Sequence, residues 1–179
     1  AYLVDEKGTR FEASRDPNVK VVVETQSPTR VTIAASGWYV SVKDPRQRLC
    51  KFVTRISAFA GSPMLRVRHY TTITFDTDQK QLADLGFFVP TPKATHYSLG
   101  VDGKAVAGTL PAEEGALFLH QDRWDRLRLV SDRKTTPGKR SDAWFSVQEG
   151  QFRLTAVLRD VWQKFPKEVG LSSKGITLH

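Results

Sequence analysis

Apolar and polar residues alternate with a period of two along most of the chain, which is typical of β-strands that bury one face. The clearest segment is residues 64–75, where the odd-numbered positions are mostly apolar and the even-numbered positions mostly polar. The odd-numbered side includes Leu65, Val67 and also His69. We therefore expect a long, central strand here, with its odd-numbered side chains directed into the core.

The same alternation predicts further short strands separated by turns. Asp102-Gly103 has the composition of a type I′ hairpin turn, and Ser36-Gly37 is a second expected turn. Residues 131–141 have the composition of a polar loop and residues 170–175 that of a turn, while residues 160–165 predict the only helical turn. The other expected strands cover residues 19–24, 29–35, 38–42, 52–60, 85–89, 97–101, 104–107, 117–121, 127–130, 144–147 and 152–158, and a last one starts at residue 176. The predicted fold class is all-β, with very little helix.

Pro90-Thr91-Pro92 is the best boundary in the chain, because paired prolines cannot join a central β-ladder. We therefore expect two β units, residues 1–92 and residues 93–179. The sequence begins with Ala1, and the strand expected from residue 176 ends at His179. We expect this chain to be a piece of a longer protein, with exposed apolar area or unpaired strands at its ends.

Basic residues outnumber acidic ones, 27 to 19, and the excess is divided equally between residues 1–90 and 91–179. Such a surface attracts anions, whether nucleic acid, anionic lipid or acidic polysaccharide, although it is equally consistent with a merely solvated surface. No zinc-finger spacing, RNA-stacking signature or long basic helix is present, so we expect no nucleic-acid partner. No apolar run approaches 18 residues, so we expect no membrane-spanning helix and no membrane partner.

The sequence lacks the residue spacings of common metal and cofactor sites. The single cysteine, Cys50, excludes an internal disulfide and a multi-cysteine metal site. The four histidines are scattered, and no phosphate-binding glycine loop, Gly-x-Ser-x-Gly elbow or His-Glu-x-x-His motif occurs. We therefore expect no metal and no cofactor.

Residues 120–126 form the densest polar and aromatic cluster in the chain. Trp124 suits the apolar face of a sugar ring, and Arg123 and Arg126 suit a carboxylate. Gln121 is able to hydrogen-bond a pair of hydroxyls. These four residues are our substrate-binding candidates. The alternative is a corner between a strand and a loop, with Trp124 in the core and the charges solvated.

Three residues are candidates for a catalytic base: His69, Tyr70 and His120. A histidine on an apolar strand face is more often a core residue bonded to a backbone carbonyl, and we prefer that interpretation for His69. The other three tryptophans, Trp38, Trp144 and Trp162, are expected in the core.

Three stretches resemble the exo-acting rhamnogalacturonan lyase-like family of polysaccharide lyases. They are FVTRISAFAGSPMLRVRHY at residues 52–70, EGALFLHQDRW at residues 114–124 and LTAVLRDVWQKFPKEVGLSSKGITLH at residues 154–179. The resemblance implies three parts in order: a RIFT-type β-barrel, a central β-sandwich and a C-terminal α/α-toroid. Residues 1–92 resemble the later part of the barrel, residues 93–179 resemble an incomplete central sandwich, and nothing resembles the toroid.

The resemblance implies elimination chemistry on rhamnogalacturonan or a similar acidic pectic polysaccharide. Much of the catalytic equipment is expected on the missing toroid, so no catalytic residue of the family is transferred to this chain. We interpret the chain as the β portion of such a lyase, supporting the catalytic domain and lining the substrate cleft, and we predict that it is inactive in isolation. The alternatives are a stand-alone carbohydrate-binding module and a purely structural β-sandwich. The sequence leaves the cellular location open, with a secreted or periplasmic one favoured.

Overall fold

The computed structural model describes residues 1–179, and almost all of its regular structure is β. It contains sixteen strands and one 3₁₀ turn, η1 (Ala13–Arg15), so the all-β prediction is confirmed. No helix is long and apolar enough to cross a membrane. The chain divides into two compact units, Ala1–Leu85 and Gly86–His179, and the division falls within strand β7 (Leu82–Pro90).

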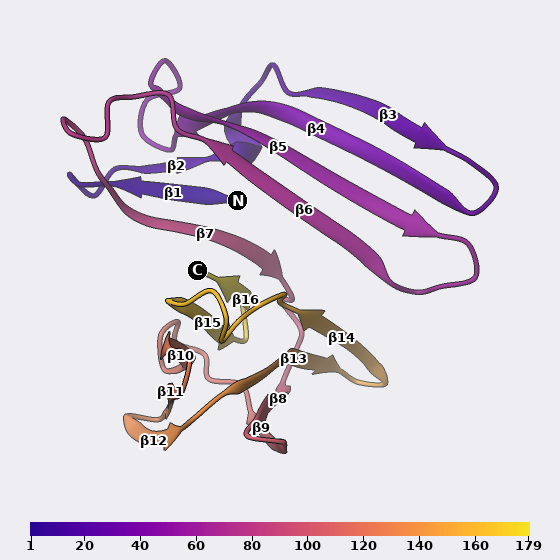
Figure 1. Cartoon of the computed structure of the whole chain (residues 1–179), viewed down its shortest axis with the longest axis vertical. Helices are drawn as coiled ribbons and strands as arrows, with labels where there is room; N and C mark the ends of the chain where they lie inside the picture. The colour runs from indigo at the N-terminus through magenta and orange to yellow at the C-terminus, as the bar shows by residue number, and fades with distance from the viewer. The chain divides into compact units, whose positions relative to one another are not determined.

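The first unit is built on long antiparallel strands, which run side by side in Figure 1. Strand β4 pairs with β5, and β5 pairs with β6, which is an edge strand. Strands β2 and β3 both pair with β4, and β1 pairs with β2. The strands are β1 (Tyr2–Asp5), β2 (Arg10–Glu12), β3 (Lys20–Gln26), β4 (Arg30–Ser41), β5 (Arg48–Phe59) and β6 (Leu65–Thr72).

The expected turn at Ser36-Gly37 is absent, because β4 continues through it. Gly37 serves a different purpose: a Cβ atom there would lie 2.6 Å from the Asp16 carboxylate, which packs against the strand at this point. One β-bulge follows directly. Trp38 pairs with Lys51 but Tyr39 pairs with Leu49, so Cys50 is an extra residue on β5. Beyond the bulge the strands reach the buried cluster of this unit, which contains Leu3, Phe11, Ala13, Tyr39, Leu49, Cys50 and Phe52.

The far part of the β3–β6 sheet has two chemically different faces. Paired residues of antiparallel strands share a face, so the register assigns every side chain. One side, the apolar face, carries large exposed aliphatic residues: Val21, Val23, Val31, Ile33, Ile56, Leu65 and Val67. The other side, the polar face, carries Lys20, Thr32, Ser36, Trp38, Lys51, Arg55, Ser57, Phe59, Arg66, Arg68 and Tyr70, together with the aliphatic residues Val22, Ala34 and Val53.

The expectation for residues 64–75 is therefore partly wrong. The segment does form a strand, but β6 lies at an edge of its sheet rather than at the centre. Its odd-numbered residues share one face as expected, yet Leu65 and Val67 are 65% and 46% exposed. Alternation showed which side chains share a face, but it does not reveal whether another layer covers that face.

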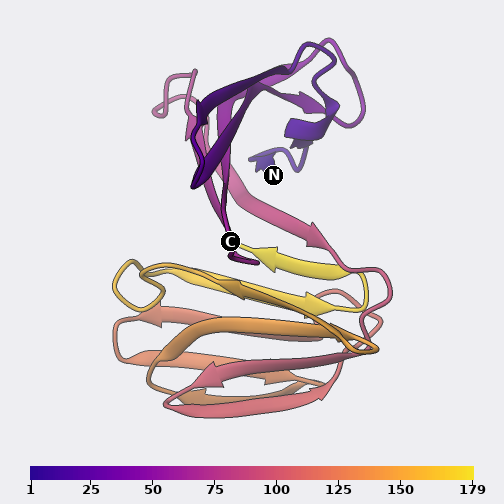
Figure 2. The ribbon, with the colours of Figure 1, turned by 90° about the vertical axis from the view of Figure 1, so that its right-hand side faces the viewer.

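The second unit is a β-sandwich of two antiparallel sheets, whose strands lie side by side in Figure 2. One sheet has the order β12-β11-β10-β15-β16-β7 and the other the order β14-β13-β8-β9. Leucines and valines of the first sheet pack against Tyr97, Leu99, Phe145 and Val147 of the second. The strands are β8 (His96–Val101), β9 (Lys104–Thr109), β10 (Leu117–Arg123), β11 (Arg126–Ser131), β12 (Lys134–Gly138), β13 (Ser141–Glu149), β14 (Phe152–Val157), β15 (Lys167–Ser172) and β16 (Gly175–Leu178).

One local expectation in this unit is wrong and two are partly confirmed. The polar stretch 131–141 contains strand β12, reached through a turn at Asp132 and Arg133, which both have positive φ. Residues 170–175 contain the expected turn, at residues 173–174, between the end of β15 and the start of β16. Residues 160–165 form turns with one helical hydrogen bond, from the Lys164 N–H to the Asp160 carbonyl oxygen at 3.0 Å, but no regular helix. The hairpin at Asp102-Gly103 is confirmed, with φ values of 51° and 75°.

Candidate functional site

Two tryptophans and an arginine form an exposed cluster on the second unit. Trp124 lies at the tip of the β10–β11 hairpin and is 50% exposed. Trp162 lies in the turns after β14, and Arg140 lies between β12 and β13. The guanidinium carbon of Arg140 is 5.4 Å from the Trp124 ring centroid and 4.5 Å from that of Trp162. Both contacts are within the range of cation–π attraction. We call these three residues the Trp–Arg–Trp cluster.

Gln121 fixes the backbone next to this cluster. Its side chain is fully buried, at 0% exposure. The amide nitrogen donates to the carbonyl oxygens of Arg123 and Lys139, at 2.6 and 2.9 Å, and lies 3.2 Å from that of Arg126. The amide oxygen accepts the N–H of Ser141 at 2.9 Å. All of its polar atoms are used within the protein, so Gln121 shapes the site and has no atom left for a sugar hydroxyl.

Asp102 holds the same segment from the other side. Its carboxylate accepts the N–H groups of Lys139 and Arg140, at 2.9 and 2.7 Å. Its own N–H donates to the carbonyl oxygen of Arg140 at 2.9 Å. Residues 139–141 are therefore clamped between Asp102 and Gln121. This clamp fixes the backbone of Arg140, and its guanidinium contacts both indole rings.

The remaining predicted binding residues lie on the same hairpin but differ in their partners. Arg126 is paired with Asp122, at 2.9 and 2.8 Å. The side-chain hydrogen bond from Arg126 lowers the pKa of the Asp122 carboxyl. Arg123 is exposed at the end of β10. Arg126 is thus already neutralised by the protein, whereas Arg140 contacts aromatic rings rather than a carboxylate of the chain.

The structure does not bring the three candidate bases together on one face. His120 bonds Glu168 on the neighbouring strand β15, at 2.9 Å, in the second unit. His69 and Tyr70 lie on β6 of the first unit and point to opposite faces of the sheet. Tyr70 is 50% exposed on the polar face.

His69 is the centre of a polar network beside the first core. Its Nε2 is 2.5 Å from the Tyr39 hydroxyl, and its Nδ1 is 2.7 Å from the Thr54 hydroxyl. Burial, followed by the charge of the chain's amino terminus, lowers the pKa of His69 to about 4. Burial also raises the pKa of Tyr39, which has no exposed surface. Both ring nitrogens of His69 thus bond side-chain hydroxyls.

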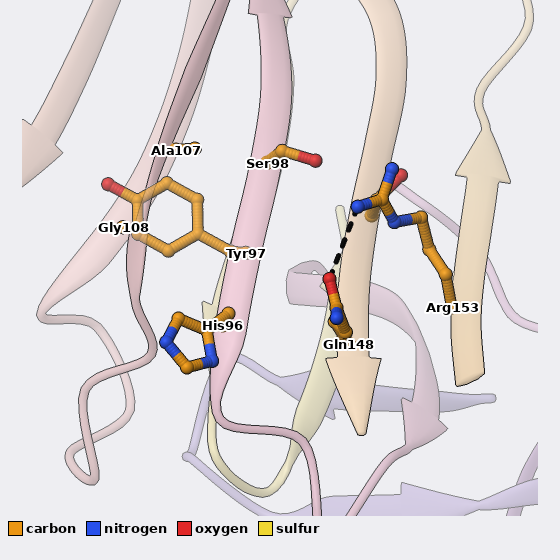
Figure 3. A pocket seen from close by; sticks show the side chains of 8 residues that line it. His96, Tyr97, Ser98, Ala107, Gly108, Gln148 and Arg153 are labelled. Atoms are coloured by element: carbon orange, nitrogen blue, oxygen red, sulfur yellow. Dashed lines mark hydrogen bonds between the residues drawn. The ribbon is translucent and has the colours of Figure 1, made fainter. Parts of the chain in front are cut away.

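A shallow pocket of about 470 Å³ lies on the outer face of the four-stranded sheet (Figure 3). His96, Ser98 and Gln148 line it, and Arg153 reaches the Gln148 amide oxygen at 3.2 Å. The Tyr97 ring lies toward Gly108, where a side chain would collide with it. The lining thus combines polar side chains and one arginine with the apolar surface of Tyr97 and Ala107. No group of three or more histidine, cysteine or acidic side chains in the chain is arranged to hold a metal ion.

The comparisons with known proteins give one family. The family model of the PcRGLX-like protein central beta sandwich domain matches residues 5–98, slightly more than half of the chain. This chain belongs to that family. The match confirms the resemblance to the rhamnogalacturonan lyase-like family for the β portion. No curated protein and no solved structure matches the chain.

The match also bears on how the chain is divided. We assigned the central sandwich to residues 93–179, and that range shares only residues 93–98 with the family match. The barrel-like assignment of residues 1–92 stays a prediction. The two sheets of the second unit are a structural observation that does not depend on the family.

Sequence reasoning found the hairpin part of the site and missed the rest. Trp124 and Arg123 stand in one dense cluster with Gln121, which drew attention to them. Arg140 was only one of several cations in an expected loop, and Trp162 was expected in the core. In the structure Trp162, like Trp38 and Trp144, is partly exposed. Only the long-range bonds to Asp102 and Gln121 show why Arg140 belongs to the site.

Proposed function

We propose that this chain is the β portion of a polysaccharide lyase-like protein that acts on rhamnogalacturonan or a similar acidic polysaccharide. In this proposal it lines the substrate cleft with the Trp–Arg–Trp cluster and supports the domain that carries the chemistry. The observation that carries the proposal is the contact of Arg140 with two indole rings, on a segment whose backbone is held by hydrogen bonds to Asp102 and to the buried Gln121.

The cluster combines the two features that recognition of a uronic acid needs. An indole ring is a flat apolar surface for the C–H face of a sugar. A guanidinium binds a carboxylate through two parallel N–H bonds and keeps its charge at all ordinary pH values. Because Arg140 is held by rings and not by an acidic side chain, a sugar carboxylate is its natural ionic partner. Arg123 adds a second exposed cation on the hairpin.

The supporting role rests on the apolar face of the first unit. Seven large aliphatic side chains are exposed there on neighbouring strands. Contiguous exposed apolar residues mark interaction surfaces in soluble proteins. The family is described as a central domain, which implies neighbouring domains in the parent protein. We assign the apolar face to the α/α-toroid domain of that parent.

The same arrangement accounts for our expectation that the isolated chain is inactive. Elimination requires a carboxylate neutraliser, a base and a proton donor around one sugar. His69 is bound in an internal network and His120 is bound to Glu168, and they belong to different units. No unsaturated uronate product should form when the purified chain is mixed with rhamnogalacturonan oligosaccharides.

Calorimetric titration of matched oligosaccharides tests the binding role. We expect galacturonate-containing oligosaccharides to bind and neutral ones of equal length to bind much more weakly, with affinity falling as salt is added. Trp124→Ala and Arg140→Gln should each reduce affinity about tenfold, because each removes an interaction worth about 1–2 kcal/mol. Arg140→Lys should recover only part of the loss, since an ammonium lacks the planar fork.

Arg133→Gln is the matched control, because Arg133 is an exposed arginine in the β11–β12 turn outside the cluster. It should leave the affinity unchanged. Equal binding of acidic and neutral sugars, or an equal loss in Arg133→Gln, would remove the proposed role of the cluster.

The polar pocket on the four-stranded sheet favours a second candidate, a stand-alone carbohydrate-binding module. Hydroxyl and amide groups of Ser98, Ser146 and Gln148 line it together with His96. This function predicts that Gln148→Ala weakens binding of a neutral oligosaccharide while Trp124→Ala does not. Weaker binding in Trp124→Ala but not in Gln148→Ala supports the Trp–Arg–Trp cluster as the binding site.

A further inference from the structure

We propose that the polar face of β4, β5 and β6 is a second, extended binding surface for a linear carboxylated polysaccharide. The ligand class rests on the proposed function, but the surface lies in the other unit and shares no residue with the Trp–Arg–Trp cluster. Four features of this face carry the proposal: repeated pairs of a cation and a ring, an open floor, a preformed hollow and an excess of positive charge.

Three pairs of a cation and an aromatic ring follow one another along the face. Lys51 lies 4.9 Å from the Trp38 ring, and Arg55 lies 5.7 Å from the Tyr70 ring. Arg66 lies 5.5 Å from the ring of Phe59. The members of these pairs on β5 are Lys51, Arg55 and Phe59. They are four residues apart, which is about 13 Å at the usual rise of a strand. The face thus offers both kinds of sugar-binding group at a regular interval.

The floor between these pairs is made of small side chains. Thr32, Ser36 and Ser57 share the face, and the hydroxyls of Thr32 and Ser57 lie 2.9 Å apart. These residues leave the centre of the sheet low, with the longer cations and rings on either side. Thr32 is buried, at 7% exposure, whereas Ser36 and Ser57 are partly exposed, and their hydroxyls suit those of a polysaccharide.

A hollow of about 390 Å³ lies at the end of the face, lined by Trp38, Lys51 and Arg48 among others. Asp16 shapes its wall, accepting the N–H groups of Trp38 and Asn18 at 2.8 and 3.0 Å. Burial alone would raise the pKa of Asp16, but these two bonds and the charge of Arg48 lower it overall. The hollow is therefore held open by internal bonds and carries two exposed cations at its rim.

Charge on this face is mostly unneutralised. Glu24 accepts two bonds from Arg55, at 2.7 and 2.9 Å, and so neutralises that residue. Lys20, Arg66 and Arg68 are exposed on the same side of the sheet. The opposite face of the same strands carries aliphatic residues instead. Positive charge is thus concentrated on one side, where it attracts an anionic polymer.

The spacing favours a glycan over nucleic acid. Each strand of duplex DNA carries one charge per 3.4 Å, whereas the exposed cations Arg66 and Arg68 are two residues apart on β6, about 7 Å, and the ring–cation pairs on β5 are about 13 Å apart. A polymer whose charged sugars alternate with neutral ones has widely spaced carboxylates and flat rings between them. Such a chain matches alternating cations and rings, with its first sugars in the hollow.

Two measurements on the whole chain test this surface, with a long galacturonate-containing oligosaccharide as the probe. The first is calorimetric titration of the triple variant Lys51→Gln, Arg66→Gln and Arg68→Gln. We expect about a tenfold loss of affinity and a weaker dependence on salt, because three charges facing the ligand are removed. The control is the triple variant Lys7→Gln, Lys43→Gln and Arg46→Gln, which removes the same charge from exposed residues outside the face and should leave the affinity close to that of the parent chain.

The second measurement is the change in backbone amide NMR signals on addition of the oligosaccharide. Shifts along β4, β5 and β6 support the surface, and shifts restricted to residues 120–126 and 139–141 overturn it while leaving the proposed function intact. Equal losses in the two triple variants would overturn it as well. A single-stranded oligonucleotide of equal charge that binds as tightly would show a general polyanion surface and overturn the glycan assignment.

Discussion

Gln121 illustrates how a single buried side chain sets the position of a residue far along the chain. Its amide bonds the backbone of Lys139 and Ser141, on either side of Arg140. Leaving such buried groups without partners costs about 1–3 kcal/mol each. The residue is therefore a positioning residue, and its effect on ligand binding is expected through Arg140 rather than through direct contact.

His69 makes the stability of the first unit depend on pH. Its pKa of about 4 in the folded protein lies below the ordinary value of 6.5, so the unfolded chain takes up a proton first as the pH falls. Stability should be full above about pH 6.5 and decrease between pH 6.5 and pH 4, by no more than about 3 kcal/mol. Hydrogen exchange of β4–β6 amides at pH 7 and pH 5 measures this loss.

His69→Gln should flatten this pH dependence, because glutamine keeps hydrogen-bonding groups but does not titrate. His96→Gln is the control, since His96 is exposed on the second unit. The explanation fails if the amides of the first unit respond to pH equally in the parent chain and in His69→Gln.

At the scale of the strand, the bulge at Cys50 sets the geometry of the first unit. Cys50 is the extra residue on β5 and has a φ of 60°, a conformation that favours glycine. Its N–H donates to the Thr74 hydroxyl at 3.2 Å, and its side chain is fully buried. Burial raises the pKa of its thiol. The bulge pairs Tyr39 with Leu49, and both residues belong to the buried cluster of this unit.

Substitution at Cys50 should therefore follow backbone preference more than side-chain size. Cys50→Gly loses packing but relieves the left-handed conformation, so we expect a change below about 1 kcal/mol in the free energy of unfolding. Cys50→Val should cost about 2 kcal/mol, because a β-branched residue is strained there. Denaturant unfolding followed by circular dichroism compares the two variants. A Cys50→Gly variant that is less stable than Cys50→Val would contradict the strain argument.

The elements that the sequence predicted well are those with a local signal. Asp102-Gly103 predicted its hairpin because glycine tolerates positive φ. Asp132 and Arg133 also have positive φ, but no glycine marks that turn in the sequence. Gly37 was interpreted as a turn residue, but it is small because of Asp16, which is distant in sequence. Alternation located strand faces, and contacts between distant residues decided which strands were continuous.

The candidate site, too, was predictable from the sequence only where its residues are close together along the chain. Trp124 and Arg123 lie in one short hairpin, so their proximity was readable from the sequence. Arg140 and Trp162 reach them only because β12, β13 and the turns after β14 return to this corner. The polar face of the first unit was equally hidden, since its ring and cation pairs join β4, β5 and β6.

For the whole molecule, the apolar face should make the purified chain bind hydrophobic dyes while it is fully folded. Ile33 and Ile56 lie at the centre of this face and are each 42% exposed. Ile33→Thr with Ile56→Thr keeps good strand formers and should abolish most dye fluorescence. Phe152→Thr with Val157→Thr, exposed on β14 of the second unit, is the control. An equal decrease in both pairs would argue against a dominant apolar face.

The alternation of β6 gives neighbouring residues opposite selective pressures. The side chains of Arg66 and Arg68 lie on the polar face of the sheet, whereas the side chain of Val67 between them lies on the apolar face. A library of single substitutions should therefore tolerate polar residues at one position and reject them at the next. Ligand preference on one side is then able to drift by point mutation without altering the interface on the other, whereas a one-residue shift in the register of β6 exchanges both surfaces at once.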